Sequence, residues 1–205
     1  MYEIINNVLK DELKYEINYP EIKFNKCEFG ISIFNDRNKA DALKLEKYAK
    51  GELFEDAKKT YEYNKNNNYP IMVYELIKQY EITENNALFI SLYSDEYTFT
   101  GGAHGNTIRT SQNFNVQIGR EIPLQYFYPN DENYVIKILQ SINQQIKAQI
   151  ENGSNQYFDN YCELVLQTFN LKSYFVKNSK VNIYFQQYDI APYSSGIPVF
   201  EIEKT

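Results

Sequence analysis

Residues 71–117, IMVYELIKQYEITENNALFISLYSDEYTFTGGAHGNTIRTSQNFNVQ, decide the fold. Residues 71–83 and 87–100 have strand character, and the turn 84–86 between them has a length that suits a hairpin. A glycine-rich loop then interrupts the pattern before strand character resumes over 107–117. We therefore predict a meander of three or four antiparallel strands.

Upstream of this meander the sequence predicts two more strands and a helix. Residues 13–19 and 28–34 alternate apolar and polar side chains, which is the strand pattern, and Pro20 is expected to end the first of them. Between residues 37 and 63 the apolar positions step by four, which predicts a helix with one face against a sheet. That stripe is formed by Leu45, Ala49, Leu53, Ala57 and Tyr61.

Downstream of the meander the sequence predicts two further helices and three short strands. The first helix begins after a cap at Asn130 or Asp131 and ends at Gly153, and the second covers residues 156–169. The strands are expected near residues 173–176, 180–187 and 197–202.

The predicted fold class is therefore α+β, an antiparallel sheet (meander) with about three helices packed on one face. The length of 205 residues favours a single α+β domain over 1–205, with residues 1–100 and 101–205 as the halves of one unit. No apolar run reaches about 18 residues, so the sequence predicts no membrane span.

Charge and composition exclude several kinds of site. The chain has 21 basic and 27 acidic residues, a net charge of −6, which argues against a nucleic-acid partner because phosphate binding needs an excess of Lys and Arg. The single histidine, His104, excludes a three-histidine zinc site, and we expect neither a metal nor a cofactor. The 20 tyrosines fit either a codon bias or a Tyr/Asn-rich binding surface.

Cys27 and Cys162 lie far apart and form no Cys-x-x-Cys pair, so they are interpreted as two separate buried thiols. One long-range disulfide between them is the alternative if the protein is exported.

The first group of candidate ligand-binding residues is Gly101, Gly102, His104, Gly105 and Asn106. Three glycines within five residues imply backbone angles or close approaches that side chains would forbid. Because a strand follows and the loop has no lysine, a phosphate-binding loop is excluded. His104 is interpreted either as a general base or as a residue that cross-links the loop by hydrogen bonds.

The second group of candidate ligand-binding residues is Tyr188, Asp189, Pro192 and Tyr193. Tyrosines beside a Pro/Gly turn are typical of a binding loop, and the alternative is that Asp189 caps the turn while the tyrosines cover the sheet end. A hydrolase-like enzyme that uses His104 and Asp189 is a rival hypothesis. No G-x-S-x-G elbow supports a serine nucleophile for it, and we assign no catalytic residue.

Two stretches also carry a family resemblance. Residues 101–124, which begin GGAHGN, and residues 184–198, YFQQYDIAPYSSGIP, resemble motifs of a bacterial domain-of-unknown-function family, as does Tyr19-Pro20. That family forms the outer part of the anti-sigma factor RsiV and precedes the catalytic domain of the peptidoglycan deacetylase PdaC. Asp189 stands where the family usually has Glu.

The resemblance implies a non-enzymatic binding module, because the RsiV domain is a lysozyme receptor and the hydrolytic work of PdaC belongs to another domain. The expected partner is a basic, lysozyme-like protein or a cell-wall component. A cytoplasmic protein with an unrelated partner is a further alternative. Localisation is expected to be extracytoplasmic if a leader has been removed and cytoplasmic if the chain is complete.

Overall fold

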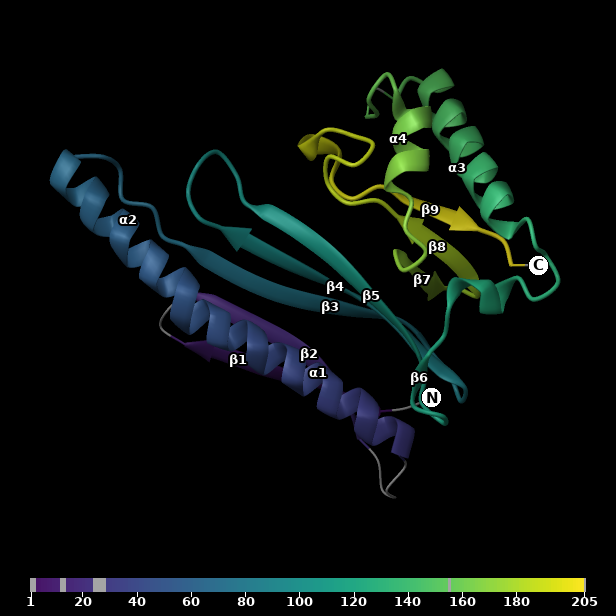
Figure 1. Cartoon of the computed structure of the whole chain (residues 1–205), viewed down its shortest axis with the longest axis horizontal. Helices are drawn as coiled ribbons and strands as arrows, with labels where there is room; N and C mark the ends of the chain where they lie inside the picture. Colours follow the sequence, from purple (N-terminus) through teal and green to yellow (C-terminus); the bar gives the residue numbers. More distant parts are fainter. Residues whose placement is uncertain (1–2, 12–13, 24–28, 155, 205) are drawn as a thin grey trace. The chain divides into compact units, whose positions relative to one another are not determined.

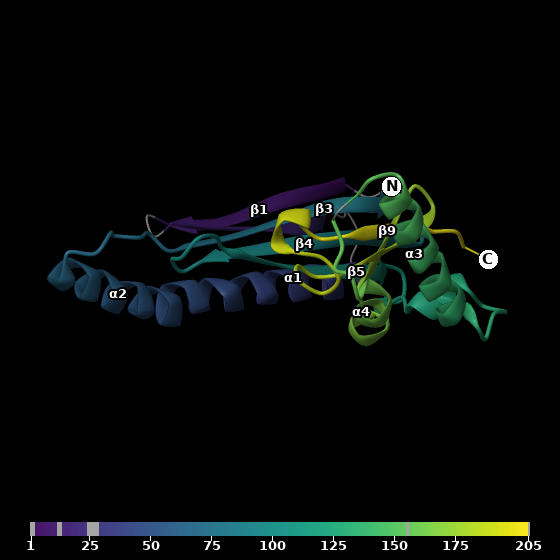
Figure 2. The ribbon, with the colours of Figure 1, turned by 90° about the horizontal axis from the view of Figure 1, so that it is seen from above.

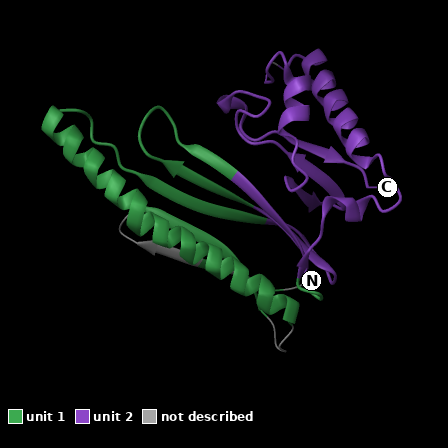
Figure 3. Cartoon of the chain, viewed as in Figure 1, with its two compact units in different colours: residues 1–81, 94–108, 116–119 green, residues 82–93, 109–115, 120–205 purple. Residues whose placement is uncertain are grey.

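The structure is a computed structural model that describes residues 3–11, 14–23, 29–154 and 156–204. The chain forms two compact units, which Figure 3 shows in different colours. Unit 1 comprises residues 1–81, 94–108 and 116–119, and unit 2 comprises residues 82–93, 109–115 and 120–205. Each unit is described by itself below.

The strands form two sheets (Figure 1). The six-stranded sheet has the order β1 (Glu3–Asp11), β2 (Tyr15–Lys23), β3 (Glu75–Asn85), β4 (Phe89–Phe99), β5 (Asn106–Asn115) and β6 (Arg120–Glu121). The three-stranded sheet has the order β7 (Tyr174–Lys177), β8 (Lys180–Tyr184) and β9 (Val199–Ile202). The predicted α+β class, with a mostly antiparallel sheet, is confirmed, and β3 to β6 follow one another as a meander.

One feature of the six-stranded sheet was not predicted: β2 pairs with β3 in parallel. Tyr15 stands opposite Leu76 and Ile17 opposite Lys78. A parallel pair needs a long crossover connection. Here the crossover is a helical run of three segments, α1 (Phe29–Tyr48), the π turn η1 (Ala49–Leu53) and α2 (Phe54–Asn67).

This helix begins earlier than expected, so the predicted strand at 28–34 is wrong over its described residues. Phe29, the first residue of α1, is 74% exposed. The buried positions are Gly30, Ile31, Phe34, Asn38 and Ala42, a spacing of three and four that suits a helix. A Cβ on Gly30 would lie 2.0 Å from the carbonyl oxygen of Val116, so only glycine allows this close approach.

The π turn explains how a stripe with a strict four-residue step stays on one side of the helix. At 3.6 residues per turn such a stripe drifts by about 40° per step. A π turn closes over five residues and resets the direction of the side chains that follow. Ala49 and Leu53 are consequently buried in the core of unit 1 with Tyr15, Ile17 and Leu76.

Strand β2 does not end at Pro20 as predicted but continues to Lys23, and Pro20 stands opposite Asn6 of β1. Beyond Ile17 no residue of β3 is in register with β2, so the missing N–H of Pro20 interrupts no ladder on that side. The side chain of Asn35 takes the place of a strand neighbour: its Oδ1 accepts from the N–H of Ile22 and its Nδ2 donates to the carbonyl of Ile22.

Unit 2 holds the larger core. The helices α3 (Tyr134–Glu151) and α4 (Tyr161–Thr168) lie near the positions predicted for them. Ile138, Ile142 and Ile146 of α3 and Val165 of α4 belong to one buried cluster with residues of β7, β8 and β9. Short 3-10 turns, η2 (Leu124–Phe127) and η3 (Tyr193–Ser195), complete the unit. None of the helices in the described ranges has the length and hydropathy of a membrane span.

A buried polar network crosses the core of unit 2. Ser91 is completely buried, and its hydroxyl donates to Oδ1 of Asn113 at 2.7 Å and accepts from the N–H of Val176 at 2.7 Å. The amide of Asn113 then donates to the carbonyl of Tyr174 at 2.8 Å. The network therefore joins β4 and β5 to β7.

Candidate functional site

The glycines of the loop 101–106 are required by its backbone, in unit 1. Gly101 and Gly102 have φ angles of +99° and +92°, a region that side chains rarely adopt. Gly105 is buried, and a Cβ there would lie 2.4 Å from the ring of Tyr97. Asn106 is exposed and begins β5.

His104 lies at the surface of this loop, with its Nδ1 2.9 Å from the carbonyl oxygen of Gly105. Because a carbonyl only accepts, Nδ1 carries the proton in this contact. The contact joins His104 to the adjacent residue of the loop.

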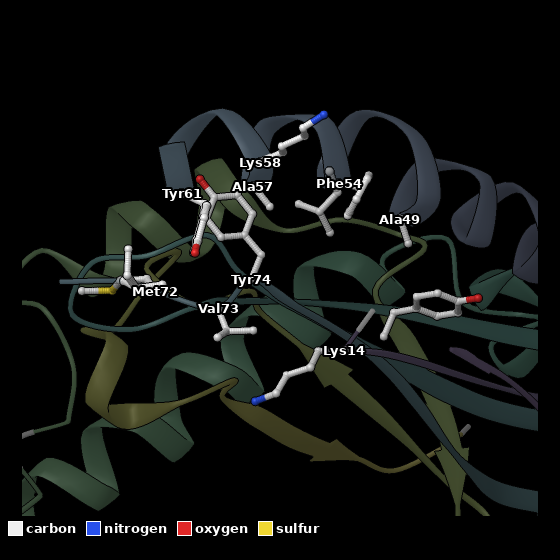
Figure 4. Close-up of a pocket in the computed structure, with 12 residues that line it drawn as sticks. Lys14, Ala49, Phe54, Ala57, Lys58, Tyr61, Met72, Val73 and Tyr74 are labelled. Atoms are coloured by element: carbon white, nitrogen blue, oxygen red, sulfur yellow. The ribbon is translucent and has the colours of Figure 1, made fainter. Parts of the chain in front are cut away.

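Two grooves lie beside each other in unit 1, and sequence reasoning missed both. The smaller has a volume of about 320 Å³, includes Gly101 and Gly102 in its wall and is otherwise lined by Thr60, Asn64, Tyr69, Pro70, Met72 and Thr100. The larger, of about 440 Å³, shares Met72 and is shown in Figure 4. His104 is not among the residues that line either groove.

The larger groove, hereafter the α2 groove, is predominantly apolar. It is lined by Lys14, Tyr15, Ala49, Leu53, Phe54, Ala57, Lys58, Tyr61, Ile71, Met72, Val73 and Tyr74. Tyr74 points toward the helix, and its hydroxyl lies 3.0 Å from the hydroxyl of Thr60 and donates to Asp56. The volume of the α2 groove, about 440 Å³, falls within the range of small-ligand and peptide sites.

In unit 2 the second group of candidate residues forms an ordered turn. The carboxylate of Asp189 accepts from the N–H of Gln186 at 2.7 Å, and the N–H of Asp189 donates to the carbonyl of Gln186 at 3.1 Å. Between them Tyr188 takes a positive φ of 68°. Burial raises the pKa of Asp189, while the bond from Gln186 acts in the opposite direction. Asp189 thus caps this turn.

The tyrosines of this turn stand on a buried base. Ile190 and Ala191 are buried, and Pro192 leads into the 3-10 turn η3. The ring of Tyr188 is 53% exposed and lies 6.0 Å from the ring of Tyr193. The hydroxyl of Ser195 donates to the carbonyl of Gln156 at 2.7 Å and holds the end of the loop.

The side chain of Gln186 forms an amide bridge beside this turn, of the same kind as the bridge from Asn35 to Ile22 in unit 1. Oε1 of Gln186 accepts from the N–H of Arg109 at 2.9 Å, and Nε2 donates to the carbonyl of Arg109 at 2.7 Å. The guanidinium of Arg109 lies 3.9 Å from the ring centre of Tyr93 and 5.9 Å from that of Tyr184, a cation–π arrangement. The turn is therefore anchored to β5 through Gln186.

Two family models match two successive stretches of the chain. Residues 7–107 match the family model described as "Deacetylase PdaC", and residues 127–205 match that of "Protein of unknown function (DUF3298)". The chain therefore contains a PdaC-type region followed by a DUF3298 region. The resemblance inferred from the sequence motifs is thereby confirmed. No functionally curated protein shows significant similarity to the chain.

Solved structures of DUF3298 proteins share the fold. A member from Bacteroides fragilis superposes with a TM-score of 0.67 at 16% identity, covering 99% of this chain and 89% of its own. A member from Pseudomonas aeruginosa gives a TM-score of 0.51 at 17% identity with the same coverage. At these identities the similarity concerns the fold.

Three further expectations concern a metal site, the pair His104 and Asp189, and the two cysteines. The described part of the chain contains no cluster of three or more His, Cys, Asp or Glu that suits a metal ion. His104 belongs to unit 1 and Asp189 to unit 2, and each has a local hydrogen bond to the backbone. Cys162 is a free, exposed thiol on α4, so the expectation that it is buried is wrong, and Cys27 lies outside the described residues.

Proposed function

We propose that this protein, with its PdaC-type and DUF3298 regions, is a non-enzymatic binding module whose partner is a basic, lysozyme-like protein. The observation that carries the proposal is the turn 186–196 of unit 2. Tyr188 is exposed and the half-buried Tyr193 lies beside it, on a backbone already fixed by Asp189 and Ser195. Tyrosines with little freedom to lose are effective contact residues.

Charge supports a basic partner. The chain has a net charge of −6, and opposite net charges accelerate encounter between proteins. Charge alone gives weak, unspecific attraction, which is largely screened beyond about 8 Å at physiological ionic strength. Specific recognition must therefore come from the turn 186–196 with Tyr188 and Tyr193, hereafter the tyrosine turn.

The experiment is a calorimetric titration with a C-type lysozyme at about 0.15 M salt, with lysozyme activity measured in parallel. Tyr188→Ala and Tyr193→Ala are expected to weaken binding at least about tenfold each if they are central contacts. Tyr126→Ala is the matched control, because Tyr126 is another exposed tyrosine of unit 2.

Two results would overturn this proposal. Binding that is lost at about 0.15 M salt would show charge attraction alone. Equal loss for Tyr126→Ala and Tyr188→Ala would show that the turn has no special role. The same titration with soluble peptidoglycan fragments tests a cell-wall component as partner: saturable binding of these fragments without lysozyme binding would replace the protein partner.

A further inference from the structure

The α2 groove exists because the helix of unit 1 is longer than the strand beneath it. The hydroxyl of Tyr15, the first residue of β2, donates to Glu46 at 3.0 Å, so β2 begins beneath that part of the helix. Helix α2 runs on to Asn67, and both Figure 1 and Figure 2 show it continuing past the end of β2. None of its 14 residues is buried.

The apolar stripe predicted from the sequence continues along this unsupported part of the helix. Ala49 and Leu53 are buried, but Phe54 and Tyr61 are 39% and 47% exposed. Ala57 lies between them in the wall of the groove, where its small side chain leaves space (Figure 4). A helix face of this kind normally packs on a sheet.

The returning segment 71–74, which lies outside the strands, offers unpaired backbone in the same groove. It precedes β3 directly, and Ile71, Met72 and Val73 are 49%, 40% and 51% exposed. In the described part of the chain, no hydrogen bond engages the backbone of these three residues. No described strand lies beside them in the position that would continue β2. Unpaired strand edges of this kind recruit a further strand.

The charges of the groove indicate what kind of strand fits. Among the described residues its lining contains Lys14 and Lys58 but no carboxylate. The ammonium group of Lys14 points away from α2, toward the opposite side of the groove (Figure 4). Lys14 forms an ion pair with the partly exposed Glu75 at 3.2 Å, which is a weak interaction near the surface. A strand with apolar residues toward α2 and acidic residues on its other face would complement both sides.

We propose that the α2 groove binds an extended peptide of alternating apolar and acidic residues as an additional β-strand beside residues 71–74. Main-chain hydrogen bonds to that edge would supply affinity. The apolar side chains would pack on Phe54, Ala57 and Tyr61, while the carboxylates face Lys14. This site lies in unit 1 and takes an acidic ligand, so it is independent of the tyrosine turn and of its basic partner.

The probe is a capped, fluorescent pentapeptide Val-Glu-Val-Glu-Val, since four residues of strand edge extend over about 13 Å. Fluorescence polarisation is expected to show saturable binding with a dissociation constant below about 1 mM. The Val-Lys-Val-Lys-Val peptide is expected to bind at least about tenfold more weakly. A peptide with methylated backbone nitrogens on the edge-facing side should not bind, because it lacks the required donors.

Three pairs of variants locate the peptide. Because the N–H of Leu76 donates to the carbonyl of Lys14 and backbone groups alternate along a strand, the N–H of Met72 faces the open edge. Met72→Pro removes this N–H and should abolish binding, whereas Met72→Leu keeps it and should retain binding. Lys14→Glu should weaken binding, whereas Lys23→Glu breaks a comparable exposed ion pair, with Glu3 at 3.0 Å, and should have no effect. Ala57→Trp fills the groove and should block binding, whereas Ala40→Trp, on an exposed part of α1, should not.

Circular dichroism and thermal unfolding of each variant show that it is folded. The proposal is overturned if no peptide binds, if the lysine peptide binds equally well, or if the methylated peptide binds as the parent does. Dodecanoate tests whether the groove binds an acyl chain instead. The proposal is also overturned if dodecanoate binds to the wild type, Ala57→Trp abolishes that binding, and the peptide does not bind, because the groove would then be an acyl-chain site.

Discussion

The buried hydroxyl of Ser91 gives the sharpest stability prediction. Replacing Ser91 with Ala removes the acceptor for the N–H of Val176 and the donor to Oδ1 of Asn113, both at 2.7 Å. Since Ser91 is completely buried and Asn113 is 4% exposed, water is not expected to replace these bonds without rearrangement. Each of the two buried groups left without a partner costs about 1–3 kcal/mol, so Ser91→Ala is expected to lower the free energy of unfolding by about 2–6 kcal/mol.

Urea unfolding, followed by tyrosine fluorescence and by far-ultraviolet circular dichroism, measures this loss. The two probes also show whether the two units unfold together, which decides whether one free energy describes the transition. The matched control is Ser94→Ala on the same strand, because Ser94 is nearly as buried and makes no side-chain hydrogen bond to a described residue. Its expected effect is within about 0.5 kcal/mol.

A double-mutant cycle separates the network from simple loss of packing. Once Asn113 is also Ala, the acceptor that Ser91→Ala leaves unpaired is gone, so the double variant should lose about 1 kcal/mol less than the sum of the single variants. The argument for the network would be refuted if Ser91→Ala changed stability no more than Ser94→Ala. Strict additivity with Asn113→Ala would refute the proposed coupling between the two side chains.

Three other predictions follow from single sites. Gly30→Ala should destabilise the protein by at least about 2 kcal/mol, since the new Cβ would meet the carbonyl of Val116. Gly51→Ala should instead stabilise the helix by up to about 1 kcal/mol, because a Cβ there has nothing within 4 Å. Equal urea midpoints of the two variants would contradict this reasoning. Burial raises the pKa of Asp189, so the folded state holds the carboxyl proton more tightly than the unfolded state does. The wild type should therefore gain stability relative to Asp189→Asn as the pH falls from the raised pKa toward 3.8. The effect would be excluded if the two proteins differed in urea midpoint by the same amount at pH 7 and at pH 4. Cys162 should react with a maleimide in the folded protein nearly as fast as in urea, and mass spectrometry showing strong protection would contradict its exposure.

The local patterns of the sequence were sufficient where short-range periodicity determines the structure. The three- and four-residue spacing of Ile138, Ile142 and Ile146 predicted α3, and these residues are buried as expected. The hairpin between β3 and β4 followed from its short polar turn, in which Oδ1 of Asn86 accepts from the N–H groups of Leu88 and Phe89. In each case the residues that decide the outcome lie within a few positions of one another.

Prediction failed where distant residues decide. Phe29, Ile31 and Ile33 alternate like a strand, but the approach of Gly30 to Val116 and the burial of Phe34 place them on a helix. In the turn 186–196, the cap by Asp189 was one of the interpretations available from the sequence, and its carboxylate accepts from the N–H of Gln186.

The α2 groove was missed for a related reason. The stripe through Ala57 and Tyr61 was visible in the sequence, and so was the apolar run 71–73. A stripe indicates which side of a helix is apolar but not where the strand beneath it begins. That position depends on the parallel register of Tyr15 with Leu76, which no local pattern encodes.

The two amide bridges, from Asn35 to Ile22 and from Gln186 to Arg109, have a consequence for how the protein behaves at high concentration. Each occupies both hydrogen-bonding groups of one strand residue with a side chain of the same molecule. A strand closed in this way no longer presents those groups to a neighbouring molecule, which guards against edge-to-edge aggregation. The protein thus protects part of its sheet from self-association with two side chains, where a covering strand would require many more residues.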